Sequence, residues 1–235
     1  MKINYHKILI FVLPLFLGAC TVTNNLYLND AVPLEKEEGE FFLGVGSGLQ
    51  PAIDEITEDG DVVFSDSLKA APNLVLSLKG GLGKNFTLNF GVHLPYILSG
   101  FGMNFGTQYS FFPKESRINV APGINFGFVI SRTELFNEPL KSVPPVSGAM
   151  NLDLYLPFSF VLKENYRLIL TPRLSSNIMF IKKNVDFDDN RWFKPMFQIY
   201  SAGLRLNKIY IEASAIYFKQ KLLPNAGIAF VFGEH

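Results

Sequence analysis

The residues with the clearest capacity for chemistry are few: one cysteine, Cys20, and three histidines. His6 lies near the start of the chain, His235 is its last residue, and only His93 lies in the body. His93 and Ser99 are the one nearby pair that could give an activated hydroxyl, because a serine nucleophile needs a base held beside it. Their spacing matches no catalytic pattern of lipid-modifying enzymes. We therefore predict that the protein is not an enzyme.

Motifs for phosphate or metal binding are incomplete. The glycine-rich stretch 44–49 is close to a dinucleotide fingerprint, but Leu49 replaces its last glycine and no helical pattern follows. A single cysteine excludes an internal disulfide and a cysteine-based zinc cluster. The acidic stretch around Asp59 departs from a calcium loop at Thr57 and Asp66. We predict no cofactor and no metal.

Composition narrows the class of protein. Lys and Arg number 21 and so do Asp and Glu, so the chain lacks the positive charge of a nucleic-acid-binding protein. Charged residues make up 18% of the chain, below the roughly 25% of an ordinary soluble domain. Phe alone supplies 23 of the 235 residues. This apolar content excludes a disordered chain.

The first twenty residues have the pattern of an export signal. Lys2 and Lys7 precede the apolar run 8–16, which is too short to span a bilayer as a helix. The run ends in Leu17-Gly18-Ala19-Cys20, which resembles the lipobox of bacterial lipoproteins, Leu-x-[Gly/Ala]-Cys, at every position. The resemblance covers only this segment. It implies cleavage before Cys20, lipid on the thiol and acylation of the new amino group; an ordinary signal peptide is the alternative.

This resemblance divides the chain into three parts. Residues 1–19 are expected to be a lipoprotein signal peptide, residues 20–40 the lipidated cysteine with a polar periplasmic tether, and residues 41–235 a β-barrel domain. Several acyl chains, at about 0.8 kcal/mol per buried methylene, make a firm anchor. Thr21 in place of Asp after the cysteine fits sorting to the outer membrane in enteric bacteria.

From residue 41 onward, apolar and polar residues alternate with a period of two, which indicates β-strands. The expected strands have lengths near the 9–11 residues of a tilted membrane-crossing strand. The sequence therefore predicts an all-β, antiparallel up-and-down transmembrane β-barrel of about ten strands, within a range of 8–12. They are expected near 41–49, 72–81, 85–95, 100–111, 117–130, 148–160, 166–180, 195–206, 209–218 and 224–232.

The alternation also fits a soluble barrel with its apolar face inward, and three observations favour the membrane. The polar face is mostly Gly, Asn, Ser, Thr and Gln, as expected for a narrow lumen. Tight connections alternate with longer segments at 50–71, 131–147 and 181–194. Aromatic residues gather near both strand ends, as at membrane interfaces. One set is expected at the tight turns (Phe41, Phe42, Phe86, Phe111, Phe112, Phe158, Phe160, Tyr166, Phe230, Phe232) and one toward the long loops (Tyr96, Phe101, Phe128, Phe180, Trp192, Phe193, Tyr217, Phe218).

Charged residues on the polar faces are expected to pair inside the barrel, because an unpaired charge in a narrow lumen is costly. A hairpin that pairs Phe160 with Tyr166 sets Asp153 opposite Arg173. A tight hairpin at Asn207-Lys208 makes Arg205 and Glu212 diagonal neighbours. The remaining candidates on these faces are Lys79, His93 and Arg167. They indicate either a filled, sealed interior or a polar pathway, and a barrel of about ten strands favours the sealed one.

Three functions remain open. The first is a non-enzymatic outer-membrane lipoprotein barrel, acting in envelope structure or through an extracellular partner of the loops 50–71, 131–147 and 181–194. The second is a small pore or transporter. The third is a soluble, lipid-anchored β-barrel or sandwich that binds an apolar ligand. We expect a monomer in contact with outer-membrane lipid, both termini periplasmic, and no nucleic-acid partner.

Overall fold

The computed structural model describes residues 23–24, 28–56, 62–95, 100–132, 146–163, 166–182 and 190–234. The predicted signal peptide and Cys20 lie outside these ranges. Within them, no helix is long and apolar enough to cross a membrane.

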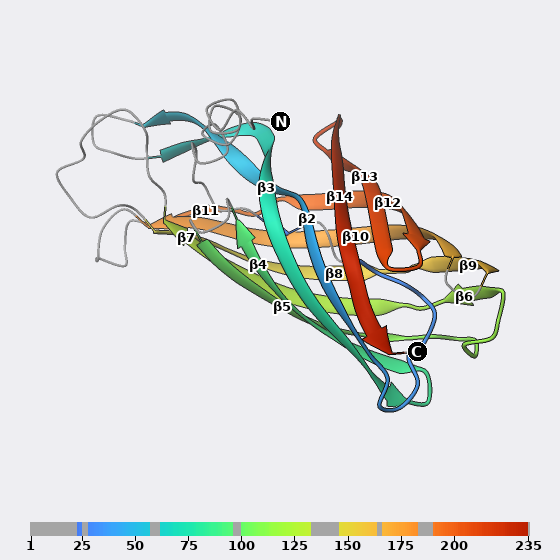
Figure 1. Cartoon of the computed structure of the whole chain (residues 1–235). Helices are drawn as coiled ribbons and strands as arrows, with labels where there is room; N and C mark the ends of the chain where they lie inside the picture. Colours follow the sequence, from blue (N-terminus) through green and yellow to red (C-terminus); the bar gives the residue numbers. More distant parts are fainter. Residues whose placement is uncertain are drawn as a thin grey trace, which may run out of the picture.

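The fold is a closed antiparallel barrel of ten strands. Neighbouring strands pair in sequence order, and the last strand pairs with the first, Phe232 opposite Phe41. Figure 1 shows β14 lying beside β2, where the sheet closes. The strands are β1 (Thr23–Asn24), β2 (Gly39–Ile56), β3 (Val62–Gly83), β4 (Phe86–Pro95), β5 (Gly100–Tyr109), β6 (Ile118–Val120), β7 (Gly123–Arg132), β8 (Val146–Tyr155), β9 (Phe158–Lys163), β10 (Tyr166–Lys182), β11 (Asn190–Phe193), β12 (Met196–Leu206), β13 (Ile209–Phe218) and β14 (Lys221–Glu234).

All ten predicted strands are confirmed, two of them with a short break. β6 and β7 are one barrel strand interrupted at Ala121-Pro122, and β8 and β9 are another interrupted at Leu156-Pro157. Proline has no N–H to donate to a ladder, so the regular pairing lapses at these points. Backbone bonds from Ala121 N to the Pro157 carbonyl and from Leu156 N to the Pro172 carbonyl, both 3.1 Å, still hold the wall together.

Two predicted loops are wrong in extent. Most of the segment 50–71 belongs to β2 and β3, whose pairing continues from Leu49 opposite Ala70 to Ile56 opposite Val62. In the segment 181–194, β10 continues to Lys182 and β11 pairs back onto it. Backbone hydrogen bonding continues these hairpins through residues that no longer alternate between apolar and polar, which is why the alternation did not predict them as strand. Residues 57–61, 133–145 and 183–189, the remainder of the predicted long loops, lie outside the described residues.

The tight connections are built for hairpins. Lys84 and Asn85 have φ of 51° and 65°, the left-handed pair that a two-residue turn requires when it matches the twist of its strands. Lys219 and Gln220, at 45° and 63°, form a similar turn at the opposite end of the barrel, where a longer connection was expected. We call the end that carries the turns at Lys84-Asn85 and Asn207-Lys208 the tight-turn end, and the other end the long-loop end.

The barrel is apolar on its outer face. Each of the ten barrel strands exposes at least two large apolar side chains. Across three neighbouring strands, Phe90, Phe105 and Phe126 are paired in register and are 37%, 55% and 45% exposed. Exposed aromatics gather at the tight-turn end, where Phe86 and Tyr109 have ring centroids 4.9 Å apart. Soluble monomers rarely expose a continuous apolar surface of this extent.

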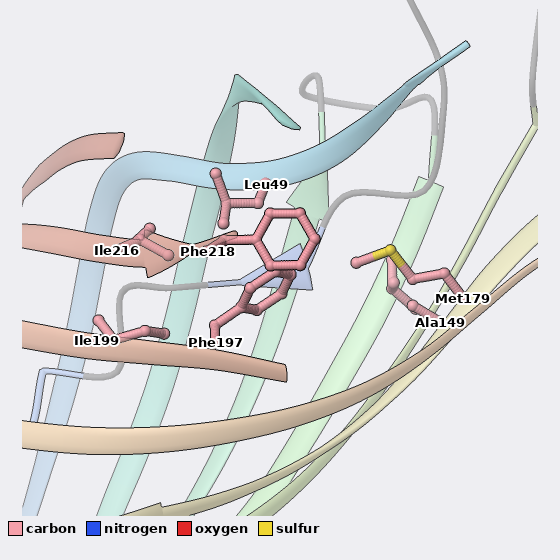
Figure 2. Close-up of a cluster of buried hydrophobic side chains, with 8 residues drawn as sticks. Leu49, Ala149, Met179, Phe197, Ile199, Ile216 and Phe218 are labelled. Atoms are coloured by element: carbon pink, nitrogen blue, oxygen red, sulfur yellow. The ribbon is translucent and has the colours of Figure 1, made fainter. Parts of the chain in front are cut away.

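The interior is layered, with an apolar layer at the long-loop end. Phe197 and Phe218 meet edge to face with centroids 5.3 Å apart, and Figure 2 shows Leu49 beside Phe218. The prediction that Phe218 joins an outer aromatic belt is therefore wrong: it is 6% exposed and packs inside. The same holds for Phe42, expected in the belt at the tight turns, which is 1% exposed and lies in an interior cluster. The whole layer, which we call the apolar layer, comprises Leu49, Val129, Ala149, Met179, Phe197, Ile199, Ile216 and Phe218.

The predicted polar tether is also wrong over part of its length. Leu28 to Leu34 are all buried, and they lie inside the barrel near the tight-turn end. We call residues 28–34 the luminal segment. Its apolar members pack on inward-facing barrel residues: Leu28 lies in one cluster with Phe42, Val75, Ile169, Tyr210, Ala229 and Val231. Four of its seven residues, Leu28, Ala31, Val32 and Leu34, are apolar aliphatics, which favours burial over solvation.

Candidate functional site

The centre of the lumen at the tight-turn end is Asp30 of the luminal segment. Its Oδ2 lies 2.6 Å from Nη1 of Arg167 and 3.6 Å from Nη1 of Arg205. Its Oδ1 accepts bonds from the Ser159 hydroxyl at 2.8 Å and from the Val32 backbone N–H at 3.0 Å. All these groups are buried, so the carboxylate is held by charge-assisted bonds out of water, where they are strongest.

A second acid shares one of these arginines. Glu40, at the start of β2, places Oε1 2.6 Å from Nη1 of Arg205. Arg205 therefore bridges a carboxylate of the barrel wall and a carboxylate of the luminal segment. The bridge connects the luminal segment to two strands of the barrel, β12 through Arg205 and β2 through Glu40.

The barrel also binds the backbone of the luminal segment. The wall donates to its carbonyls: Lys79 to Leu28, Tyr210 to Asn29 at 3.0 Å, Gln108 to Asp30 at 2.5 Å and Ser110 to Ala31 at 2.7 Å. The Ala31 N–H in turn donates to Ser159 at 2.8 Å. Buried peptide groups need such partners, because each one left unpaired costs about 1–3 kcal/mol. Side chains of the wall thus replace the water that a solvated tether would use.

The luminal segment leaves the barrel over Gly81. A Cβ at this position would lie 1.9 Å from the Glu35 carbonyl oxygen and 2.4 Å from that of Leu34. Only glycine leaves room for the passing backbone. Outside, Glu38 pairs with Lys114 of the turn between β5 and β6.

The electrostatics of Asp30 make docking of the segment depend on pH. Burial alone would raise the pKa of this carboxyl, but the charges of Arg167 and Arg205 outweigh it and lower the pKa to about 2 from 3.8. A carboxyl whose pKa is lower in the folded state stabilises that state above its unfolded pKa. The stabilisation is lost as the pH falls through the folded value.

We therefore expect the luminal segment to stay docked at pH 4 and to detach as the pH approaches 2. Pepsin, which is active over this range, should spare residues 28–34 at pH 4 and cleave them near pH 2. Glu37→Gln, a change at an exposed residue outside the barrel, should leave this transition in place. Asp30→Asn should abolish it; a transition that survives in Asp30→Asn would assign it to another group.

All six charged residues predicted for the lumen are buried, but the predicted partners differ. Asp153 lies opposite Ser175 rather than Arg173, because Phe160 pairs with Leu168 and not with Tyr166, so the register differs from the expected one by two residues. A shift of two keeps every side chain on its face. Arg173 instead has Glu212 3.9 Å away, and Asp153 accepts from Asn151 at 2.8 Å. Their exposed fractions are 5% for Lys79, 0% for Asp153, 6% for Arg167, 4% for Arg173, 2% for Arg205 and 3% for Glu212.

The second predicted hairpin has the expected register, with Leu206 opposite Ile209. Arg205 then lies opposite Tyr210, and Glu212 opposite Gly203, so the two charges are diagonal as predicted. Their ion pairs nevertheless go elsewhere, Arg205 to Glu40 and Asp30, and Glu212 to Arg173.

Above this charged region, asparagines fill the middle of the lumen. The triplet Asn-Phe-Gly occurs three times, at 89–91, 104–106 and 125–127, on β4, β5 and β7. Register sets Gly91 opposite Asn104 and Gly106 opposite Asn125, so each asparagine lies over a glycine of its neighbour. A Cβ at Gly91 would lie 2.2 Å from the Asn104 side chain. Sequence reasoning missed this repeat, although the triplets were visible in it.

His93, the one candidate general base, is 2% exposed and lies over Gly102. Ser99, its expected partner, lies outside the described residues. Among the described residues, no three His, Cys, Asp or Glu side chains gather as metal ligands.

The fold and the site together define a class: a closed ten-stranded antiparallel β-barrel whose lumen holds the chain's own segment 28–34. Comparison with protein-family models gave no match, and comparison with curated protein sequences found none that is similar.

Proposed function

We propose that the protein is a non-enzymatic lipoprotein β-barrel of the bacterial outer membrane, sealed by its own luminal segment and acting in envelope structure or through its long loops. The observation that carries the proposal is the inverted distribution of polarity. Large apolar side chains cover the outside of all ten strands, while 26 buried polar or charged residues lie within the described chain. This distribution suits a lipid exterior and a polar lumen.

The same observation argues against a soluble barrel with an apolar ligand inside. Such a barrel needs an apolar interior and a hydrated exterior. Here the described apolar layer at the long-loop end is filled by its own side chains, with Phe197 and Ile199 both 0% exposed. We therefore do not favour the apolar-ligand function.

The lipobox supports the lipoprotein part of the proposal, and the lipobox and the closed barrel together support the outer-membrane location. An export signal with a lipidation motif delivers the chain to the envelope, and closed barrels are one of the two structures that can span a membrane. The described part of the chain presents the extended β2–β3 and β10–β11 hairpin arms at the long-loop end, where a rigid barrel commonly carries its binding residues.

The proposal is tested with Cys20→Ser protein exported through an ordinary signal peptide, which removes the lipid and leaves the strands. We expect a strict requirement for detergent and a gel mobility that differs between heated and unheated samples. A monodisperse protein in buffer without detergent would show that the strands do not meet lipid, and the proposal would fail.

A gated pore is the second candidate, and one observation favours it. The lumen at the tight-turn end is filled by a segment held through side-chain contacts and one bridging arginine, rather than by wall side chains alone. Release of the luminal segment from these contacts would open the lumen at the tight-turn end. Planar-bilayer recording separates the candidates: the sealed barrel gives no channel events at neutral pH, and the pore gives them.

A further inference from the structure

The path of the amino-terminal segment through the barrel has a consequence for the lipid anchor. At the tight-turn end, the backbone of Leu34 and Glu35 lies against Gly81, and Leu34 N–H reaches the Thr87 hydroxyl at 3.5 Å. Both wall residues lie within a few positions of the β3–β4 turn. The chain therefore passes this mouth at residues 34–35.

Earlier residues lie progressively farther along the lumen. Leu28 packs with Phe42 and Val75, several positions above the mouth. Thr23 and Asn24 then pair as a strand with Leu49 and Gly48 of β2. Pairing of β2 with β14 ends at Gly46. Gly48 and Leu49, which pair with β1, lie beyond this point, toward the long-loop end. Beginning at residue 35 and reading backward, the chain thus runs along the barrel toward the long-loop end.

The distances exclude a return to the tight-turn end before Cys20. Gly39 and Leu49 are ten ladder positions apart, about 33 Å along the strand and about 25 Å in height for a strand tilted by about 40°. Only two residues separate Cys20 from Thr23, and the three Cα-to-Cα steps between them reach about 11 Å at most. An anchor at Cys20 therefore has to lie in the half of the barrel near the long-loop end.

From this path we infer that the lipid of Cys20 inserts in the leaflet on the long-loop side, so that the chain threads its own barrel and is anchored at the cell surface. The inference rests on the proposed function, because outer-membrane barrels place short turns in the periplasm and long loops outside. It replaces the expectation that both termini are periplasmic. Glu234, opposite Gly39, does lie at the tight-turn end.

The threading itself is tested by a disulfide. Thr23→Cys with Leu49→Cys places two thiols at directly opposed positions of an antiparallel pair, where Cα atoms lie about 4.5–5.5 Å apart, within disulfide range. The control is Thr23→Cys with Gly39→Cys, at the other end of β2. We expect a crosslink in the first protein only, in membranes and with the native lipid. A crosslink in the control protein, or none in the first, would overturn the inference.

The side of the membrane is tested by epitope tags in the full-length lipoprotein. One tag follows Thr21, and the matched tag lies in the exposed turn Asn207-Lys208 of the tight-turn end. In intact cells we expect antibody to bind the first tag alone, and to bind the second only after the outer membrane is permeabilised. The reverse pattern, or a first tag that needs permeabilisation, would overturn the inference.

These results are separable from a failure of the proposed function. If the Cys20→Ser protein needs no detergent, the barrel does not span lipid, and surface anchoring falls with it even if the Thr23–Leu49 crosslink forms. If the barrel needs detergent and changes mobility on heating but the crosslink and tag results fail, only the threading is wrong. Each tagged or cysteine variant is first checked for the same heat-dependent mobility, so that a misassembled barrel is not scored.

Discussion

Asp30→Arg is expected to release the luminal segment from the barrel. The substitution removes the carboxylate that Arg167 and Arg205 share and places a third cation beside them. Removing one partner of a buried ion pair costs about 3–5 kcal/mol. Added repulsion makes this a lower limit, so the docking equilibrium should fall by at least about 10²- to 10³-fold.

The release is measured by proteinase K digestion in detergent micelles, with the cleaved bonds identified by mass spectrometry. Residues 28–34 should be protected in the unsubstituted protein and cleaved in Asp30→Arg. Glu37→Arg is the matched control, since it makes the same change of charge at an exposed residue outside the lumen. Equal protection in the two variants would show that the ion pairs do not hold the segment.

The same variant also shows what seals the barrel. The apolar layer remains in place when the luminal segment leaves, with Phe197 and Phe218 packed at the long-loop end. Silent bilayer recordings from Asp30→Arg would assign the seal to that layer. Channel events would assign it to the luminal segment, as proposed.

Phe105→Arg is expected to block assembly of the barrel in the membrane. Phe105 lies in the middle of β5, 55% exposed on the outer face between Phe90 and Phe126. A charged side chain facing lipid at the bilayer midplane costs about 2–4 kcal/mol in such barrels. The cost falls to about 0–1 kcal/mol near the interfaces.

This dependence on depth gives the matched control. Phe112, 45% exposed, lies beyond the end of β5 in the turn at the tight-turn end, and Phe112→Arg should be tolerated. The measurement is the free energy of folding into lipid vesicles, followed by heat-dependent gel mobility. Equal tolerance of the two substitutions would mean that β5 faces water and not lipid.

Local pattern accounts for the parts of the fold that sequence reasoning could predict. A period of two is carried by neighbouring residues, so strands and faces could be read without any knowledge of their partners. Leu206 opposite Ile209 could also be predicted, because a two-residue turn determines the register that follows it. The burial of Lys79, Arg167 and Glu212 on the inner face follows from the same alternation.

Prediction failed where pairing depends on small departures from the regular ladder. Pairing between β9 and β10 continues to Lys163 opposite Tyr166, with a bulge at Tyr166/Arg167, so Asp153 lies opposite Ser175 and not Arg173. Phe218 follows the alternation of β13 to the inner face, but its place at a strand end suggested a membrane belt. The first error concerns the partner of a residue and the second the face on which a side chain lies, and both leave the strand itself correct.

The sequence by itself determined that the chain forms about ten amphipathic strands, with few charges on either face. Only the tertiary structure decided that residues 28–34 lie inside the barrel. Their sequence has no period, and a short run with Asp30 and Pro33 reads as a linker when considered alone. The segment is ordered by wall residues up to 181 positions away, such as Tyr210 on the Asn29 carbonyl. Those contacts exist only after the strands have closed, because closure brings their inward-facing donors together around one axis.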